Sequence, residues 1–152
     1  MLKKRIITAA ILIPLVIYAV LYLPVPFFVF LTGCIVLGAA WEWSNLMAVK
    51  HPLARFGYLL LIACILYWSL LLPIVAVPYL LTLTVVWWSL AGGMVALYPR
   101  ASAWWGSSRL VRGLMGIVVL VPCWITLNLI RTQQNGIFDI FILFALIWGA
   151  DT

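Results

Sequence analysis

The sequence predicts an all-α, polytopic integral membrane protein with about six transmembrane helices. The first observation is the composition, because 68% of the 152 residues are hydrophobic and only 8% are charged. Soluble domains carry about 25% charged residues, and a soluble core of this length could not bury so much apolar surface. The same composition gives a mean hydropathy of +1.26. The second observation is the arrangement of the apolar residues in long runs with few interruptions.

Each apolar run approaches the length of about 20 residues that a helix needs to cross a hydrocarbon layer about 30 Å thick. Prolines mark several boundaries, because proline lacks the N–H that a continuing helix requires. Pro14 and Pro122 fall inside apolar runs and are predicted to bend helices rather than end them. The expected helices are 6–23, 27–47, 56–72, 79–98, 111–130, and 137–150 or beyond.

The basic residues predict the orientation of these helices. With six spans, Arg131 alone among the nine Lys and Arg residues falls in a loop on the opposite side from the others. By the positive-inside rule the basic side is cytoplasmic, so both termini are expected to face the cytoplasm. One transmembrane span more or fewer would distribute the basic residues over both sides of the membrane. The residues on the basic side are Lys3, Lys4, Arg5, Lys50, Arg55, Arg100, Arg109 and Arg112.

Other classes of protein have less support. The basic start of the chain resembles a secretory signal, but no small-x-small cleavage site follows Val20, so a retained signal anchor is the better interpretation. The net charge of +6 is spread over three short loops, which favours membrane orientation and anionic lipid over nucleic acid. With His51 as the single histidine and no glycine-rich phosphate loop, a catalytic triad and a nucleotide loop have little support.

Small residues inside the runs are expected to serve helix packing. Gly92 and Ala96 have the small-x-x-x-small spacing that lets membrane helices approach closely, so the fourth run is the best candidate for such a contact. Cys34, Cys64 and Cys123 each lie within an expected helix and show no C-x-x-C spacing. They are interpreted as buried packing residues.

Polar side chains within the runs are few. Glu42 lies toward the cytoplasmic end of the second run, and Asn45 shares its helix face. Because a carboxylate is costly in hydrocarbon, Glu42 should face protein or a watery cavity. A structural hydrogen bond at the interface and a functional polar site are both open interpretations. Asn128, nearer the outer face, is expected to form an interhelical hydrogen bond.

The loop 99–112 is the longest connection on the basic side. Its Trp104–Trp105 pair is expected to lie at headgroup level, with Arg109 and Arg112 close to phosphate groups. One interpretation is ordinary anchoring and topology. The sharper one is contact with a phospholipid headgroup or a nucleotide phosphate. Asp151 should emerge on the same face, and carboxylates with a basic segment would suit a phosphate-bearing lipid and a magnesium-bound nucleotide.

Several motifs occur in an order that resembles the N-terminal half of bacterial phosphatidate cytidylyltransferases, also called CDP-diacylglycerol synthases. The last of these motifs is the most specific. The motifs are L-K-K-R-I-I-T-A at 2–9, A-W-E-W at 40–43, Y-P at 98–99, V-P at 121–122 and W-G-A-D-T at 148–152.

The resemblance implies an enzyme of the bacterial inner membrane that joins CTP to phosphatidate, with Mg²⁺, to give CDP-diacylglycerol and pyrophosphate. It also implies that Asp151 contacts the metal or nucleotide. Residues 1–152 would then form a single membrane domain, the N-terminal part of a larger fold. The family's most diagnostic signature lies further toward the C-terminus, so the catalytic part is expected to be absent and this chain alone inactive.

Two non-enzymatic alternatives remain open at this stage. The chain could be a membrane scaffold or partner subunit, as a homo-oligomer or with a second chain that supplies the missing half. It could instead be half of a small transporter with Glu42 as the coupling group. The transporter has less support, because the sequence shows no internal repeat and no matching pair of broken helices.

Overall fold

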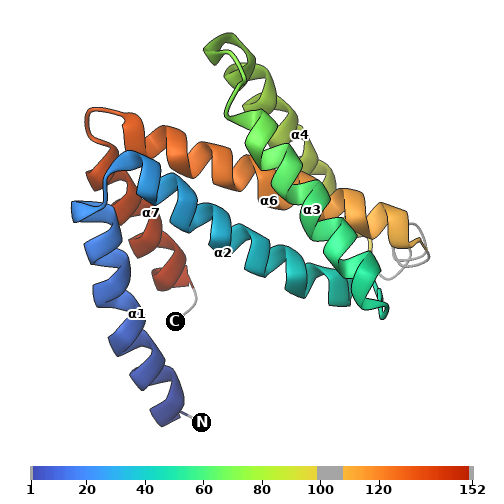
Figure 1. Ribbon diagram of the computed structural model, residues 1–152, viewed down its shortest axis with the longest axis horizontal. Coiled ribbons are helices and arrows are strands. Elements are labelled where there is room, and N and C mark those ends of the chain that lie inside the picture. Colours follow the sequence, from blue (N-terminus) through green and yellow to red (C-terminus); the bar gives the residue numbers. More distant parts are fainter. Residues whose placement is uncertain (1, 99–107, 151–152) are drawn as a thin grey trace. The chain divides into compact units, whose positions relative to one another are not determined.

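The computed structural model describes residues 2–98 and 108–150, with side chains from residue 10 onward. This part of the chain forms six α-helices and one short 3₁₀ helix, and it contains no strand (Figure 1). The elements are α1 (Leu2–Tyr22), α2 (Val25–Leu46), α3 (Pro52–Ser69), η1 (Ile74–Ala76), α4 (Val77–Ala96), α6 (Arg109–Thr132) and α7 (Gly136–Ala150).

These helices confirm the all-α prediction and fit a multi-pass membrane protein. Four stretches are both long and apolar enough to cross a bilayer: Val25–Leu46, Pro52–Ser69, Ile74–Ala96 and Arg109–Thr132. Two shorter apolar stretches, Ala10–Tyr22 and Gly136–Ala150, match the first and last predicted segments. Pro14 and Pro122 lie inside α1 and α6, as predicted.

The chain divides into two compact units. Unit 1 comprises Met1–Thr32 and Thr126–Thr152, and unit 2 comprises Gly33–Ile125. The helices α2 and α6 therefore each contribute one end to unit 1 and the rest to unit 2. Each unit is described by itself below.

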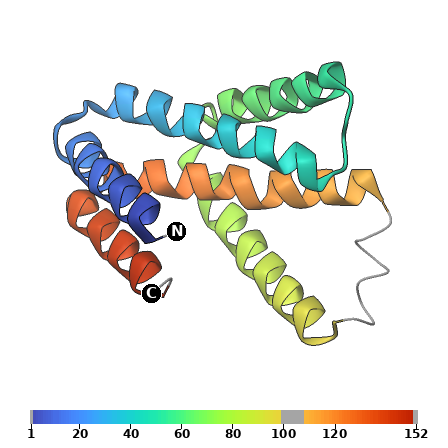
Figure 2. The ribbon, with the colours of Figure 1, turned by 90° about the horizontal axis from the view of Figure 1, so that it is seen from below.

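In unit 1, α1 and α7 lie side by side (Figures 1 and 2). Val20, Phe28 and Ile140 form its buried core, with 2%, 3% and 0% of their surfaces exposed. Partly buried apolar side chains from α1, α6, α7 and the turn between α1 and α2 surround them. These are Val16, Leu23, Leu127, Ile130, Ile137, Phe141 and Phe144.

Polar contacts also connect the helices of unit 1. The side chains of Thr32 on α2 and Asn128 on α6 form a hydrogen bond of 3.4 Å, which confirms the interhelical bond predicted for Asn128. Arg131 lies in the last turn of α6. Its Nη2 donates to the Leu23 carbonyl at 3.3 Å, and its guanidinium lies 5.7 Å from the centre of the Phe28 ring.

In unit 2, the close approach of helices depends on glycines other than the one predicted. Gly92 is exposed and a Cβ built on it would meet nothing within 4 Å, so the prediction of a tight contact at Gly92 and Ala96 is wrong. Among the described glycines of unit 2, the buried ones are Gly113 and Gly116 on α6. Small-residue spacing shows which helix faces could approach closely, but the partner helix decides which of them do.

The three cysteines also differ from expectation. Cys34, Cys64 and Cys123 lie within helices as predicted, but each side chain is exposed and each thiol is free. In a membrane, an apolar thiol on an outward helix face costs little, because the surrounding lipid is as apolar as a protein core. Their interpretation as buried packing residues is therefore wrong for this structure.

Candidate functional site

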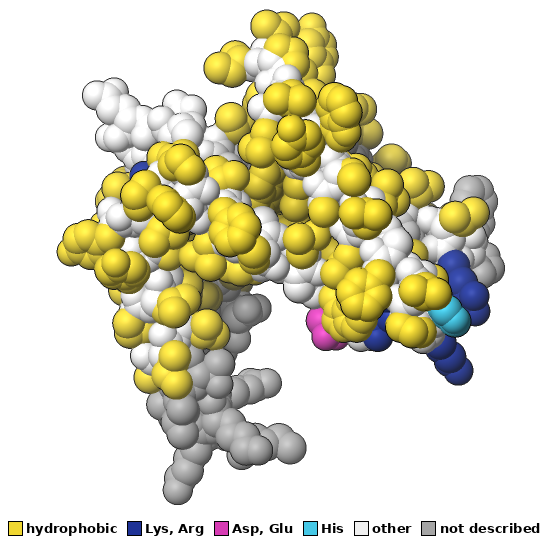
Figure 3. All heavy atoms as spheres, in the orientation of Figure 1, with side chains coloured by type: hydrophobic (Ala, Val, Ile, Leu, Met, Phe, Trp, Pro, Cys, Tyr) yellow, Lys and Arg dark blue, Asp and Glu magenta, His cyan; other side chains and the backbone are white. Residues whose placement is uncertain are grey.

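The C-terminal end of α2, the start of α3 and the start of α6 lie at the same end of unit 2 (Figure 2). Basic side chains gather there beside an acidic one, whereas most of the visible surface is apolar (Figure 3). This end of unit 2 contains three of the residues singled out from the sequence, namely Glu42, Arg109 and Arg112.

A reversal of the backbone at Ala48 ends α2. Ala48 has a φ of 54°, in the left-handed region. Its N–H donates to the Asn45 carbonyl at 2.9 Å, and the Val49 N–H donates to the Ser44 carbonyl at 3.1 Å. This pair of bonds is the Schellman motif, which satisfies carbonyls left over at a helix end. Glycine is the usual residue at such a position, so alanine here stores local strain.

Arg55, near the start of α3, binds the last turns of α2. Its Nε donates to Ser44 Oγ at 2.7 Å and its Nη2 to the Trp41 carbonyl at 3.0 Å. The guanidinium also lies 3.9 Å from the centre of the Trp41 ring, as in a cation–π contact. Ser44 is fully buried, and its hydroxyl donates to the same Trp41 carbonyl. Arg55 therefore clamps the start of α3 to the last turns of α2, and it is also one of the basic residues that predict the orientation of the helices.

The start of α6 is attached to α2 and α3 through backbone carbonyls. Trp43 Nε1 donates to the Arg112 carbonyl at 2.8 Å, and the Tyr58 hydroxyl donates to the Gly113 carbonyl at 3.1 Å. A Cβ on Gly116 would collide with the indole of Trp43 and the hydroxyl of Tyr58. Glycine at this position is what allows both aromatic side chains to reach the backbone of α6.

Arg112 is largely committed to the protein itself. Its Nη1 donates to the Leu46 carbonyl at 2.9 Å, at the end of α2. Its Nε is buried and has no hydrogen-bond partner among the described residues. A cation at a helix C-terminus is favourable because it offsets the negative end of the helix dipole. Arg109, the first residue of α6, is exposed, so its guanidinium is the more available of the two for an external phosphate.

Glu42 is exposed and accepts a hydrogen bond of 3.0 Å from Asn45 Nδ2. This bond confirms that the two side chains share a helix face. Glu42 lies on α2 between Trp41, which contacts Arg55, and Trp43, which binds α6. It also lies one turn before Leu46, whose carbonyl accepts the hydrogen bond from Arg112. The structure therefore brings Glu42 and Arg112 to the same helix end. Asp151, Arg100, Trp104 and Trp105 lie outside the described residues.

The described residues do not form a metal centre by themselves. No group of three or more His, Cys, Asp or Glu side chains lies together in the described part of the chain. Magnesium binds through one or two carboxylates with the rest of its shell from water and substrate phosphates. Glu42 is the one carboxylate at this end of unit 2, so the described residues there supply at most a single carboxylate ligand.

The structural roles of Arg55, Ser44 and Tyr58 were not predicted from the sequence. Trp41 and Ser44 are three residues apart, and Arg55 follows after one short turn, a pattern that could have indicated a clamp. The spacing of Gly113 and Gly116 near the start of α6 is a second signal that could have been used. Tyr58 gave no local signal, because its partner lies 55 residues away.

Fold and site together define a multi-pass α-helical membrane protein that presents an exposed arginine and an exposed carboxylate at one end of a clamped group of helices. The chain belongs to the cytidylyltransferase family, whose family model matches residues 3–152.

Two curated relatives carry the name phosphatidate cytidylyltransferase. The protein of Pseudomonas aeruginosa is 37% identical over 153 residues, which cover 99% of this chain and 55% of the relative. The protein of Haemophilus influenzae is 28% identical over 169 residues, covering 100% of this chain and 58% of the relative. The chain thus spans somewhat more than half the length of these relatives. No solved structure matches it.

Proposed function

We propose that this chain serves in phosphatidyl nucleotide synthesis, in which CTP and phosphatidate give CDP-diacylglycerol and pyrophosphate. The observation that carries the proposal is the family match over residues 3–152. The name shared by the two relatives and the many apolar helices both support a lipid substrate. Because the chain spans 55% and 58% of those relatives, we propose that the reaction also needs residues that correspond to the rest of them.

In the proposed reaction, a phosphate oxygen of phosphatidate attacks the α-phosphorus of CTP. The bond from that phosphorus to the bridging oxygen breaks, and pyrophosphate leaves. Charge accumulates on the phosphoryl oxygens during such a transfer, so cationic groups placed beside them lower the barrier. Arg109 is proposed to contact a phosphate of the lipid or nucleotide, because it is exposed at the start of α6, the end that the charge distribution predicts to be cytoplasmic.

Arg112 is proposed to act differently from Arg109. Its bond to the Leu46 carbonyl fixes one edge of the guanidinium, while the buried Nε donates to none of the described residues. It therefore positions the ends of α2 and α6 and adds positive charge, and direct phosphate contact would need a local rearrangement. Glu42 is proposed as a polar group facing the same aqueous surface. Mg²⁺ is proposed as cofactor with Asp151 as ligand, by resemblance to the family.

The proposed location is the bacterial inner membrane, with both termini in the cytoplasm. The positive-inside distribution supports this orientation, since Arg109 and Arg112 would then meet the anionic cytoplasmic leaflet and cytosolic CTP.

A chimera tests the proposed function. Residues 1–152 would replace the matching part of the P. aeruginosa relative, and membranes would be assayed for CDP-diacylglycerol from CTP, phosphatidate and Mg²⁺. We expect the chimera to form product and residues 1–152 alone to form none. A chimera that reaches the membrane at the level of the intact relative, melts cooperatively and forms no product would refute the proposal. Product formed by residues 1–152 alone would refute the need for further residues.

The role of Arg109 is tested in the same chimera. Arg109→Gln is expected to lower kcat/KM for phosphatidate or CTP, whereas Arg109→Lys should retain most of the activity, since a single charge can be supplied by either side chain. Equal activity of the glutamine variant and the parent chimera would remove Arg109 from the site.

A further inference from the structure

Arg109 lies on the same side of α6 as the glycines that meet α2 and α3. Seven residues of an α-helix make nearly two full turns, so Arg109 lies within about 20° of Gly116 around the helix axis and about 10 Å from it along the axis. A Cβ on Gly116 would collide with Trp43 of α2 and Tyr58 of α3, so this side of α6 contacts both helices. Arg109 itself is exposed. It therefore lies just beyond the end of this contact, where its guanidinium can reach an external group.

Two hydrogen bonds run in opposite directions between α2 and the start of α6. Trp43 Nε1 donates to the Arg112 carbonyl at 2.8 Å, and Arg112 Nη1 donates to the Leu46 carbonyl at 2.9 Å. Both bonds connect the last turns of α2 to one residue of α6. The indole is the more rigid donor, because its side chain has only two torsions. It therefore fixes a peptide group that lies one helical turn from Arg109.

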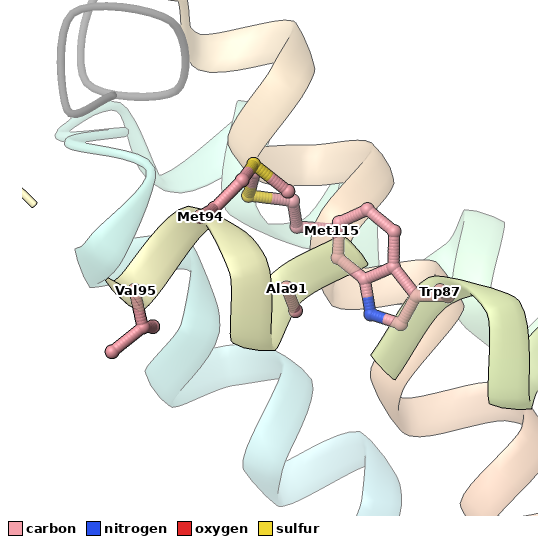
Figure 4. A pocket seen from close by; sticks show the side chains of 5 residues that line it. All are labelled: Trp87, Ala91, Met94, Val95 and Met115. Atoms are coloured by element: carbon pink, nitrogen blue, oxygen red, sulfur yellow. The ribbon is translucent and has the colours of Figure 1, made fainter. Parts of the chain in front are cut away.

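The contact of α6 with α4 is of a different kind. Met115, on another side of α6, meets Met94 of α4 beside an open apolar notch of about 160 Å³ (Figure 4). Methionine side chains adapt to irregular partners, so this contact does not fix the rotation of α6. A fixed first turn matters for catalysis, because a displacement of about 1 Å can cost about a hundredfold in rate. The bond from Trp43 is therefore the stronger restraint on the position of Arg109.

We propose that Trp43 is a positioning residue for Arg109, and that its indole hydrogen bond holds the first turn of α6 where Arg109 meets a phosphate of the lipid or nucleotide. This role rests on the proposed function, because it requires that Arg109 contacts that phosphate. It assigns a purpose to the second tryptophan of the A-W-E-W motif at 40–43, which precedes Arg109 by 66 residues in the chain.

Hydrogen exchange of the intact chain in mixed micelles tests whether Trp43 holds the start of α6. Trp43→Phe keeps an aromatic ring and removes the donor. The amides of residues 112–116 should then exchange about threefold faster, the factor expected for one interhelical hydrogen bond in a membrane protein. Trp68→Phe, the same change at an exposed position of α3, should leave these amides unchanged. Unchanged exchange in the Trp43 variant would overturn the proposal.

Kinetics of the chimera with the P. aeruginosa relative test whether this restraint acts through Arg109. Trp43→Phe should lower kcat/KM by about tenfold, since a displacement of less than 1 Å is already costly. The KM should rise for one substrate and stay the same for the other, which identifies whether the phosphate belongs to phosphatidate or to CTP. In the Arg109→Gln chimera, Trp43→Phe should change kcat/KM by less than about twofold, because the group that it positions is gone.

Gly116→Ala disturbs the same bond from the side of α6, because its Cβ would collide with the indole. It should show the same dependence on Arg109, so it replaces Trp43→Phe if that chimera does not accumulate. Equal losses with and without Arg109 would show a merely structural role and overturn the positioning role, while the proposed function would stand. A parent chimera of normal abundance that forms no product would refute the proposed function and, with it, the role of Trp43.

Discussion

Replacing Gly116 by alanine places one methyl group where three helices meet. A Cβ at this position would lie 2.5 Å from Trp43 Nε1 and 2.6 Å from Trp43 Cδ1, and it would also collide with the Tyr58 hydroxyl. Real Cβ atoms do not approach so closely, so the aromatic side chains must move. Movement would lengthen or break their hydrogen bonds to the carbonyls of Arg112 and Gly113.

The magnitude follows from three terms. Overpacking of a well-packed region costs about 1–3 kcal/mol. Two interhelical hydrogen bonds in a membrane protein contribute about 0.6 kcal/mol each. Alanine recovers about 1 kcal/mol over glycine through helix propensity. The net loss in the free energy of unfolding is therefore about 1–3 kcal/mol, so the packing term decides the sign.

The assay is reversible unfolding of the purified chain in mixed micelles by increasing SDS, followed by circular dichroism. Gly92→Ala is the matched control, since its Cβ would meet nothing within 4 Å, and it should gain up to about 1 kcal/mol. Adding Tyr58→Phe to Gly116→Ala removes the oxygen that the new methyl meets, so the double variant should lose less than the sum of the single losses. A Gly116→Ala chain at least as stable as the parent would refute the reasoning.

Three further substitutions test separate features with the same unfolding assay. Ala48→Gly should stabilise the chain by about 0.5 kcal/mol, because glycine relieves the left-handed strain but loses more backbone entropy; a destabilised variant would contradict this. Arg55→Lys should lower the free energy of unfolding by about 1–3 kcal/mol, because lysine cannot form the two guanidinium hydrogen bonds to α2. The control Arg109→Lys changes an exposed residue and should leave the stability unchanged. Equal effects of the two substitutions would contradict the clamp at Arg55. Gly136→Ala should cost at least about 2 kcal/mol, since its Cβ would collide with the backbone of the preceding turn; unchanged stability would show that this turn can shift freely.

The helices could be predicted from the sequence because hydropathy and proline carry most of the information. The observed helix boundaries differ from the predicted ones where polar residues extend a helix beyond its apolar run. The third helix begins at Pro52 rather than at residue 56, because proline is favoured in the first helical turn even though Arg55 interrupts the apolar pattern. The fifth expected segment begins at Arg109, two residues before its apolar run.

The candidate site could be predicted only in part. The shared face of Glu42 and Asn45 followed from helical spacing alone and is confirmed. The commitment of Arg112 to the Leu46 carbonyl could not be predicted, because those residues lie 66 positions apart and the bond depends on how the helices pack. Hydropathy likewise gives no preference between Gly92 and Gly116 as a packing residue.

The contacts between the end of α2 and Arg112 on α6 also have a consequence for biosynthesis. The Leu46 carbonyl and the Trp43 indole find their partners at Arg112, 66 and 69 residues later in the chain. A ribosome adds about 5–20 residues each second, so α2 would wait about 3–14 s after its own synthesis before this end could be closed. During that interval the last turn of α2 already has its bonds to Ala48, Val49 and Arg55, whereas the Leu46 carbonyl and the Trp43 indole would be left to water or lipid headgroups.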